Sequence, residues 1–162
     1  MNYRIEIKWG LIFIVMMLLW TFLEKSVGLH SQYISLHPIY SNFVIIPSVI
    51  IFVLALLDKK KKFYNGSMTY KEGFVTGFYI TIIIAVLSPI SQFIATEIIS
   101  PDYFNNVIRY SVKQGNMSQQ EAVKYYSLFN YMIFSFIGAI ILGTIISSIV
   151  AAFVKTKKRY RR

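Results

Sequence analysis

The chain has 162 residues, of which 56% are hydrophobic and 17% aromatic, and its mean hydropathy is +0.54. These values exclude an ordinary soluble domain of this length. The absence of Cys excludes disulfides, thiolate nucleophiles, Cys-ligated zinc and iron–sulfur clusters.

Four apolar stretches predict four transmembrane helices, at about residues 9–28, 39–57, 73–99 and 128–154. A helix needs about 20 residues to cross a hydrocarbon core of about 30 Å, and each stretch meets that length. A short amphipathic outer helix is predicted at about 101–114. The fold class is therefore all-α: a polytopic membrane protein with a single membrane domain over residues 1–162.

The first stretch follows a basic start, a pattern that is also typical of a secretory signal peptide. Residues 26–28 are small and offer a cleavage-like spacing. However, two Trp lie in the apolar run, and Glu24 and Lys25 separate it from the small residues. We therefore expect an uncleaved transmembrane helix.

Basic residues are concentrated on every second connection between the predicted helices. Thirteen of the seventeen Lys and Arg lie before Trp9, in the 58–72 connection or after Val154, so that side carries the whole formal charge of +10. The positive-inside rule assigns this side to the cytoplasm. We predict cytoplasmic termini, and we attribute the charge to membrane orientation and not to binding of nucleic acid.

Two clusters on the basic side also have the composition of contacts to anionic lipids. Each basic residue near an anionic surface contributes about 1 kcal/mol to membrane binding. The candidate lipid headgroup contacts are Lys59, Lys60, Lys61, Lys62, Lys155, Lys157, Lys158 and Arg159.

Proline lies inside the second and third stretches, at Pro47 and Pro89. Each removes a backbone donor and is expected to kink its helix. Kinked helices line ion sites in transporters, but they also occur in ordinary membrane bundles. Because no paired charges lie at mid-membrane, we favour the ordinary bundle.

Small residues recur at intervals of four along the third and fourth stretches. Such a face lets two helix backbones approach closely in lipid. The predicted packing residues are Gly73, Gly77, Ala85, Ala139, Gly143 and Ser147. We expect these two faces to meet; packing against a second protomer or another subunit is the alternative.

The 100–127 connection contains the largest polar segment. The Ser100-Pro101-Asp102 sequence predicts a helix start there. Ser118 and Glu121 match a capping box, and the helix they begin is expected to run directly into the fourth span. The outer helix is expected to lie on the membrane surface or cap the bundle; a docking or ligand-gating role is the functional alternative.

Polar residues also gather at the outer ends of the spans, as a candidate outer polar cluster of Glu24, His30, His37, Gln92, Glu97 and Asn130. The two histidines and Glu97 are metal ligands by type, but the histidines lie seven apart in a loop without a metal-binding spacing. We expect solvated histidines and a Glu24–Lys25 pair. No metal, cofactor or catalytic residue is predicted, and no phosphate loop, nucleophile elbow or zinc-binding helix motif is present.

Several segments together resemble the four-helix membrane proteins of domain-of-unknown-function family 4199. They are Gly28-Leu29-His30, Pro47, Asp58-Lys59-Lys60-Lys61, Met68 to Phe74, Ser88-Pro89, Pro101 to Phe104, and Gly115 to Ser118 with Glu121-Ala122. The resemblance runs from about Lys8 to Lys155. It implies a small protein of the bacterial inner membrane, and it supplies no activity and no site residues.

The leading functional hypothesis is a structural, assembly or regulatory partner that acts through helix packing and membrane contacts. Its expected partners are the lipid bilayer and a membrane protein or a second copy of the chain. The alternative is an oligomeric transporter or channel-like protein for a small solute or ion. A membrane enzyme is the third possibility, although no sequence feature supports one.

Overall fold

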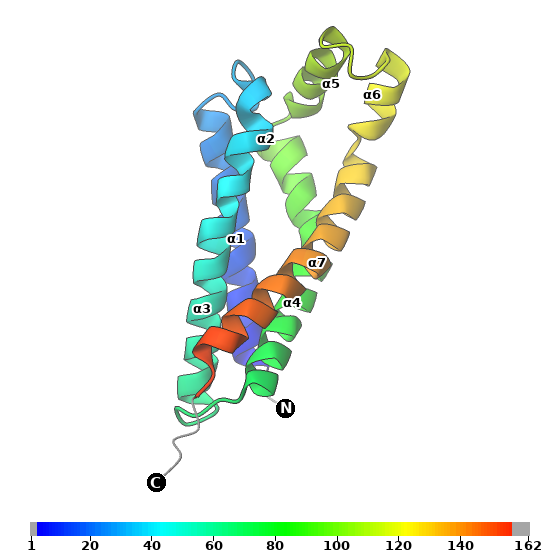
Figure 1. Ribbon diagram of the computed structural model, residues 1–162. Helices are drawn as coiled ribbons and strands as arrows, with labels where there is room; N and C mark the ends of the chain where they lie inside the picture. Colours follow the sequence, from blue (N-terminus) through cyan, green and yellow to red (C-terminus); the bar gives the residue numbers. More distant parts are fainter. Residues whose placement is uncertain (1–2, 157–162) are drawn as a thin grey trace.

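The computed structural model describes residues 3–156, and in that range it contains helices and turns but no strand (Figure 1). The elements in chain order are α1 (Arg4–Ser26), the 3₁₀ helix η1 (Ile34–Leu36), α2 (His37–Tyr40), the 3₁₀ helix η2 (Ser41–Val44), α3 (Ile45–Lys62), α4 (Tyr70–Phe93), the π-helix η3 (Ile94–Ile99), α5 (Tyr103–Lys113), α6 (Gln119–Tyr125) and α7 (Leu128–Val154).

Four helical segments are long and apolar enough to cross a membrane: Arg4–Ser26, Ile34–Lys62, Tyr70–Ile99 and Leu128–Val154. The predicted all-α class with four spanning helices and a short outer helix is therefore confirmed. Large apolar side chains such as Leu19, Ile46 and Phe153 point outward, as expected for helices surrounded by lipid.

The four long helices form two pairs that diverge toward one end (Figure 1). α1 begins and α7 ends at the end that we call inner, where the α3–α4 connection also lies; α5 and α6 cover the opposite end, which we call outer. At the inner end the backbone of Met68 exchanges hydrogen bonds with Thr156, at 2.7 and 2.9 Å. This exchange fixes the end of α7 to the α3–α4 connection.

The small-residue faces of α4 and α7 lie against each other. A methyl group added at Gly77 would lie 2.6 Å from Ser147 Oγ, and one at Gly143 would lie 2.5 Å from Thr81 Oγ1. Gly73 faces Ala151 in the same way. Ala85 is buried and Ala139 packs on the core, so these two helices approach at distances that larger side chains would prevent.

The hydrophobic core fills the inner half of the bundle. Phe52 and Leu56 of α3 and Ile80 of α4 are fully buried there, next to Val150 and Ala151 of α7.

Lys59 lies within this inner half and not at the lipid surface. Its ammonium pairs with the buried carboxylate of Glu6 at 2.7 Å and lies 4.0 Å from the centre of the Phe63 ring. The prediction of Lys59 as a headgroup contact is therefore wrong, because the face of α3 that carries it turns toward α1.

The other basic candidates differ in their surroundings. Lys60 donates to the Val154 carbonyl at 2.8 Å, and Lys62 pairs with Asp58 at 2.8 Å while its side chain stays exposed. Lys61 and Lys155 are exposed. The remaining candidates, Lys157, Lys158 and Arg159, lie outside the described residues.

The two prolines have different local settings. Pro47 lies in the first turn of α3, where a missing N–H leaves no intrahelical bond broken. Pro89 lies inside α4 and leaves the Ala85 carbonyl without its usual N–H donor, and the Ser88 hydroxyl donates to that carbonyl at 2.9 Å.

Capping explains where several helices begin and end. Thr69 and Glu72 form a capping box that starts α4 three residues before the predicted boundary. The predicted Ser118–Glu121 capping box is present, and hydrogen bonds from Ser118 lower the pKa of Glu121. The expected continuation into the fourth span is absent, because the extended Ser127 caps α7 as a separate helix.

An outer polar pocket as the candidate functional site

The turn after α1 brings the chain back over its own last turn. Gly28 has φ +83°, a conformation that favours glycine. Its N–H bonds the Lys25 carbonyl at 3.0 Å, and the Leu29 N–H bonds the Glu24 carbonyl at 2.9 Å. This Schellman pair of bonds ends the helix and carries the following residue, His30, back to Glu24.

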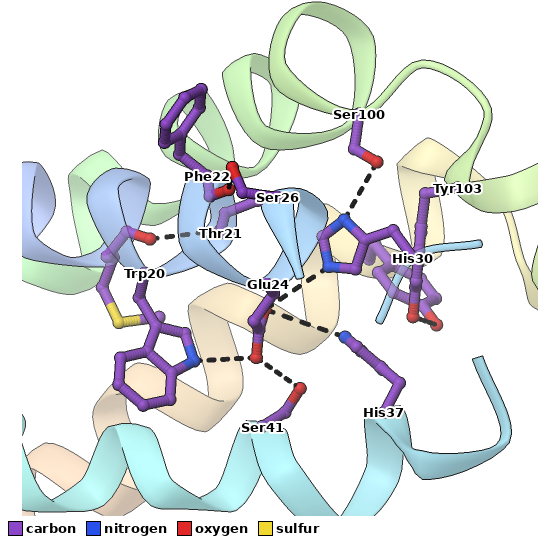
Figure 2. Close-up of polar contacts among 12 residues, drawn as sticks. Trp20, Thr21, Phe22, Glu24, Ser26, His30, His37, Ser41, Ser100 and Tyr103 are labelled. Atoms are coloured by element: carbon purple, nitrogen blue, oxygen red, sulfur yellow. Dashed lines mark hydrogen bonds and ion pairs between the residues drawn. The ribbon is translucent and has the colours of Figure 1, made fainter. Parts of the chain in front are cut away.

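Glu24 lies at the centre of the polar contacts that Figure 2 shows. Its Oε1 accepts hydrogen bonds from Trp20 Nε1 at 2.7 Å and from Ser41 Oγ at 2.6 Å. Its Oε2 faces the Nε2 atoms of His30, at 3.4 Å, and His37, at 3.8 Å. Only 5% of Glu24 is exposed, so these polar partners replace the water that a carboxylate otherwise requires.

His30 is held from its other side as well. Its Nδ1 lies 2.9 Å from Ser100 Oγ at the end of η3, and its backbone carbonyl accepts from the Asn106 side chain at 3.0 Å. The ring is buried and packs on His37 and on Tyr103, with centroid separations of 5.1 and 4.9 Å. Helix α5 therefore caps the bundle at this point.

Tyr103 packs against both histidine rings, and Tyr131 packs against Tyr103. The hydroxyl oxygens of the two tyrosines lie 3.5 Å apart. Burial raises the pKa of the Tyr103 phenol, so this group remains a neutral hydroxyl.

A pocket of about 210 Å³ opens in front of these groups, between the outer ends of α1, α2 and α7 and the η3 segment. It adjoins an apolar cavity of about 280 Å³ that lies deeper between the two helix pairs. Met17, Thr21 and Gln92 line both spaces. The arrangement is a buried carboxylate with two histidines at the entrance of a mainly apolar cleft.

The structure brings four of the six predicted cluster residues together, namely Glu24, His30, His37 and Gln92. Glu97 is exposed and does not line the pocket. Asn130 donates its amide to the Lys124 and Tyr125 carbonyls at 2.8 and 3.3 Å, so it belongs to the α6–α7 junction.

The expected surroundings of these residues differ from those observed. His30 is buried and not solvated, and Lys25 lies on the exposed face of α1. Adjacent residues on a helix project about 100° apart, which separates Lys25 from the contacts of Glu24. Trp20, Ser41, Ser100, Tyr103 and Tyr131 were not predicted as site residues. In the sequence, Gly28 could have indicated that His30 returns to Glu24, since a glycine after a helix predicts that the chain reverses there.

Chemically, the pocket offers one buried anion, two imidazoles and several hydroxyls. In membrane proteins, buried ionisable groups are costly and usually mark a site of function. The pocket has the composition of a site that binds a cation or a small polar ligand.

Comparison with known proteins places the chain in a family. The searches of curated proteins and of solved structures returned no match. The family described as "Protein of unknown function (DUF4199)" matches residues 8–156, which is nearly the whole chain. The match includes the outer pocket and all of the four long helices except the first four residues of α1. The chain is therefore a member of the DUF4199 family.

Proposed function

We propose that this protein is a regulatory or assembly subunit of the bacterial inner membrane that binds its ligand or partner at the outer pocket. Both termini would lie in the cytoplasm. The observation that carries this proposal is the contrast between a packed inner half and an outer half that opens around buried Glu24.

The packed inner half favours binding over conduction. The space between the helices is filled there by buried side chains such as Phe52 and Ile80, and the small faces of α4 and α7 are in direct contact. The Glu6–Lys59 pair stabilises the same end by linking α1 to α3. A rigid inner half provides a fixed base for changes at the outer end.

Contacts in the outer half connect the pocket to helix α5 at the outer end. Ser100 ends η3 and contacts His30, and Asn106 of α5 holds the His30 carbonyl. A ligand that moves His30 therefore acts on η3 and α5 together. Since α5 lies at the outer end, it is the element that a partner would bind.

Membrane contacts on the cytoplasmic side fit the same role. Lys61, Lys62 and Lys155 are exposed near the inner end. Anionic lipid headgroups attract such residues by about 1 kcal/mol each.

The orientation can be tested with single cysteines, because the chain has none of its own. In intact cells, a small membrane-impermeant thiol reagent should modify Asn116→Cys in the α5–α6 connection, but should modify Ser67→Cys only after lysis. Gln92→Cys, which lines both cavities, should react from outside, whereas the fully buried Thr81→Cys on the same helix should not. The reverse pattern at the two connections would overturn the orientation.

The binding role is tested by gentle solubilisation, affinity capture and mass spectrometry. A partner should be recovered with the wild type and with the control Glu97→Gln, and it should be lost when His30 and His37 are both replaced by Ala. Recovery of the wild type free of any partner would contradict the proposal, as would a partner whose binding is unaffected by the double replacement.

Transport of a small solute is the second candidate function. It is favoured by the continuity of the outer pocket with the apolar cavity and by the interruption of the third span at Pro89 and η3. Flux in proteoliposomes that changes with Gln92→Ala and not with Glu97→Gln would support it.

A further inference from the structure

We propose that Glu24, His30 and His37 bind a divalent metal ion of the zinc class, with a fourth coordination position open to the outer pocket. This inference rests on the proposed function, because it names the ligand of the same pocket. It adds a chemical identity that neither the family nor the sequence spacing supplies.

The donor set selects the class of metal. Two imidazole nitrogens and one carboxylate oxygen suit Zn²⁺ and its neighbours in the first transition row. Ca²⁺ and Mg²⁺ prefer sites made of oxygen ligands, which this cluster does not provide. Among the described residues, Glu24 is the only Asp or Glu that lines the pocket, so it supplies the single carboxylate of a mixed site with the two histidines.

The separation of His30 from Glu24 already matches shared coordination, and the longer separation to His37 requires that ring to move closer. One ligand atom from each of the three residues lies within 4.8 Å of the other two. Charge-assisted N–H···O bonds are about 2.7–2.9 Å long, whereas the Glu24 Oε2 lies 3.4 and 3.8 Å from the two Nε2 atoms. Two ligand atoms each about 2.0 Å from a tetrahedral zinc ion stand about 3.3 Å apart.

The supporting contacts orient two of the three ligands toward one point. Ser100 engages Nδ1 of His30, which directs Nε2 of that ring at Glu24. Trp20 and Ser41 occupy Oε1 of Glu24 and leave Oε2 facing the histidines. Hydrogen bonds to the atoms of a ligand that do not bind the metal fix the rotamer and tautomer of that ligand. His37 is the most exposed ligand, at 21% of its side chain, so it can close onto a bound ion.

The surroundings also favour a cation. The described residues that line the pocket include no Lys or Arg, so no permanently charged cation opposes the Glu24 carboxylate there. The pocket of about 210 Å³ leaves space for a water molecule, or a ligand from a partner, at the fourth position. The hydroxyls of Tyr103 and Tyr131 line this space and can hydrogen-bond that fourth ligand.

The test is a titration of the purified full-length protein in detergent, with its affinity tag removed and all metal stripped. The chain has only two His, both in the proposed site, so no other imidazole competes. Zn²⁺ should bind with one ion per chain, and Co²⁺ should give the intense visible absorption of a tetrahedral site. Metal binding to the folded state should also raise the melting temperature.

Variants separate the site from adventitious binding. His37→Ala and Glu24→Gln should each weaken Zn²⁺ binding by at least about 10-fold. Ser100→Ala removes only the hydrogen bond to Nδ1 of His30 and should weaken Zn²⁺ binding by about 10-fold. Glu97→Gln should bind like the wild type. Size-exclusion profiles identify any variant that misfolds, and the mild Ser100→Ala variant keeps the inference testable in that case.

Two results would overturn the inference: a wild-type protein that binds no Zn²⁺, or equal affinity in the wild type and in the His30→Ala/His37→Ala double variant. Either result leaves the partner experiment intact. Conversely, Zn²⁺ binding by a protein that captures no partner would contradict the regulatory role alone.

Discussion

Replacing Gly143 with Leu should separate α4 from α7 and strongly destabilise the protein. Even a methyl group at this position would lie 2.5 Å from Thr81 Oγ1 and 3.0 Å from Thr81 Cβ, and a Leu side chain cannot be accommodated without moving the helices. Overpacking costs about 1–3 kcal/mol and sometimes more. At about 2–4 °C per kcal/mol for a chain of this size, the melting temperature should fall by about 2–12 °C.

The same helix supplies a matched control. Gly138 lies on α7 as well, and a methyl group added there would meet no atom within 4 Å. Gly138 is half-buried and lines the apolar cavity, so a Leu side chain has space there, and Gly138→Leu should change the melting temperature in detergent by less than about 2 °C. Equal stability of the two variants would show that the α4–α7 contact does not hold the fold together.

Lys59→Met should also be strongly destabilising, because it leaves the Glu6 carboxylate buried without its ion-pair partner. The two side chains are only 3% and 5% exposed, and the second oxygen of Glu6 makes no hydrogen bond to the described residues. Removing one member of a buried pair costs about 3–5 kcal/mol. Thermal unfolding should show a drop of about 6 °C or more.

Two further variants separate this charge effect from loss of packing. Lys61→Met removes an exposed charge from the same helix and should leave the melting temperature nearly unchanged. Adding Glu6→Gln to Lys59→Met should restore most of the lost stability, since no uncompensated buried charge remains. If the double variant is no more stable than Lys59→Met, the ion pair is not the cause.

Local patterns predicted the parts of the fold that depend on neighbouring residues. Apolar length predicts the spans because a bilayer imposes one thickness on every helix. Gly77 and Gly143 mark the contact of α4 with α7 because a repeat of four places small residues on one helix face. The capping box at Ser118 was predictable for the same reason, since its hydrogen bonds reach only three residues.

The same local reasoning was wrong where the environment decides the role of a residue. Lys59 resembles its three basic neighbours in sequence, yet it lies on the face of α3 that α1 covers. His30 and His37 lie six and thirteen residues after Glu24, spacings that match no metal motif. They converge on its carboxylate because the Gly28 turn reverses the chain and α2 packs beside the end of α1.

Composition, charge distribution and hydrophobic length thus establish a four-helix membrane protein and predict which side is basic. Each of these properties is set by the residues of a segment alone, so it does not depend on how the helices are arranged. The sequence predicted four residues of the outer pocket, but their contacts were decided by tertiary structure. These contacts require Glu24, His37 and Ser100 from three segments to meet, and a linear pattern contains no information about such distances. The burial of Glu6 with Lys59 was decided in the same way, by the rotation of one helix against another.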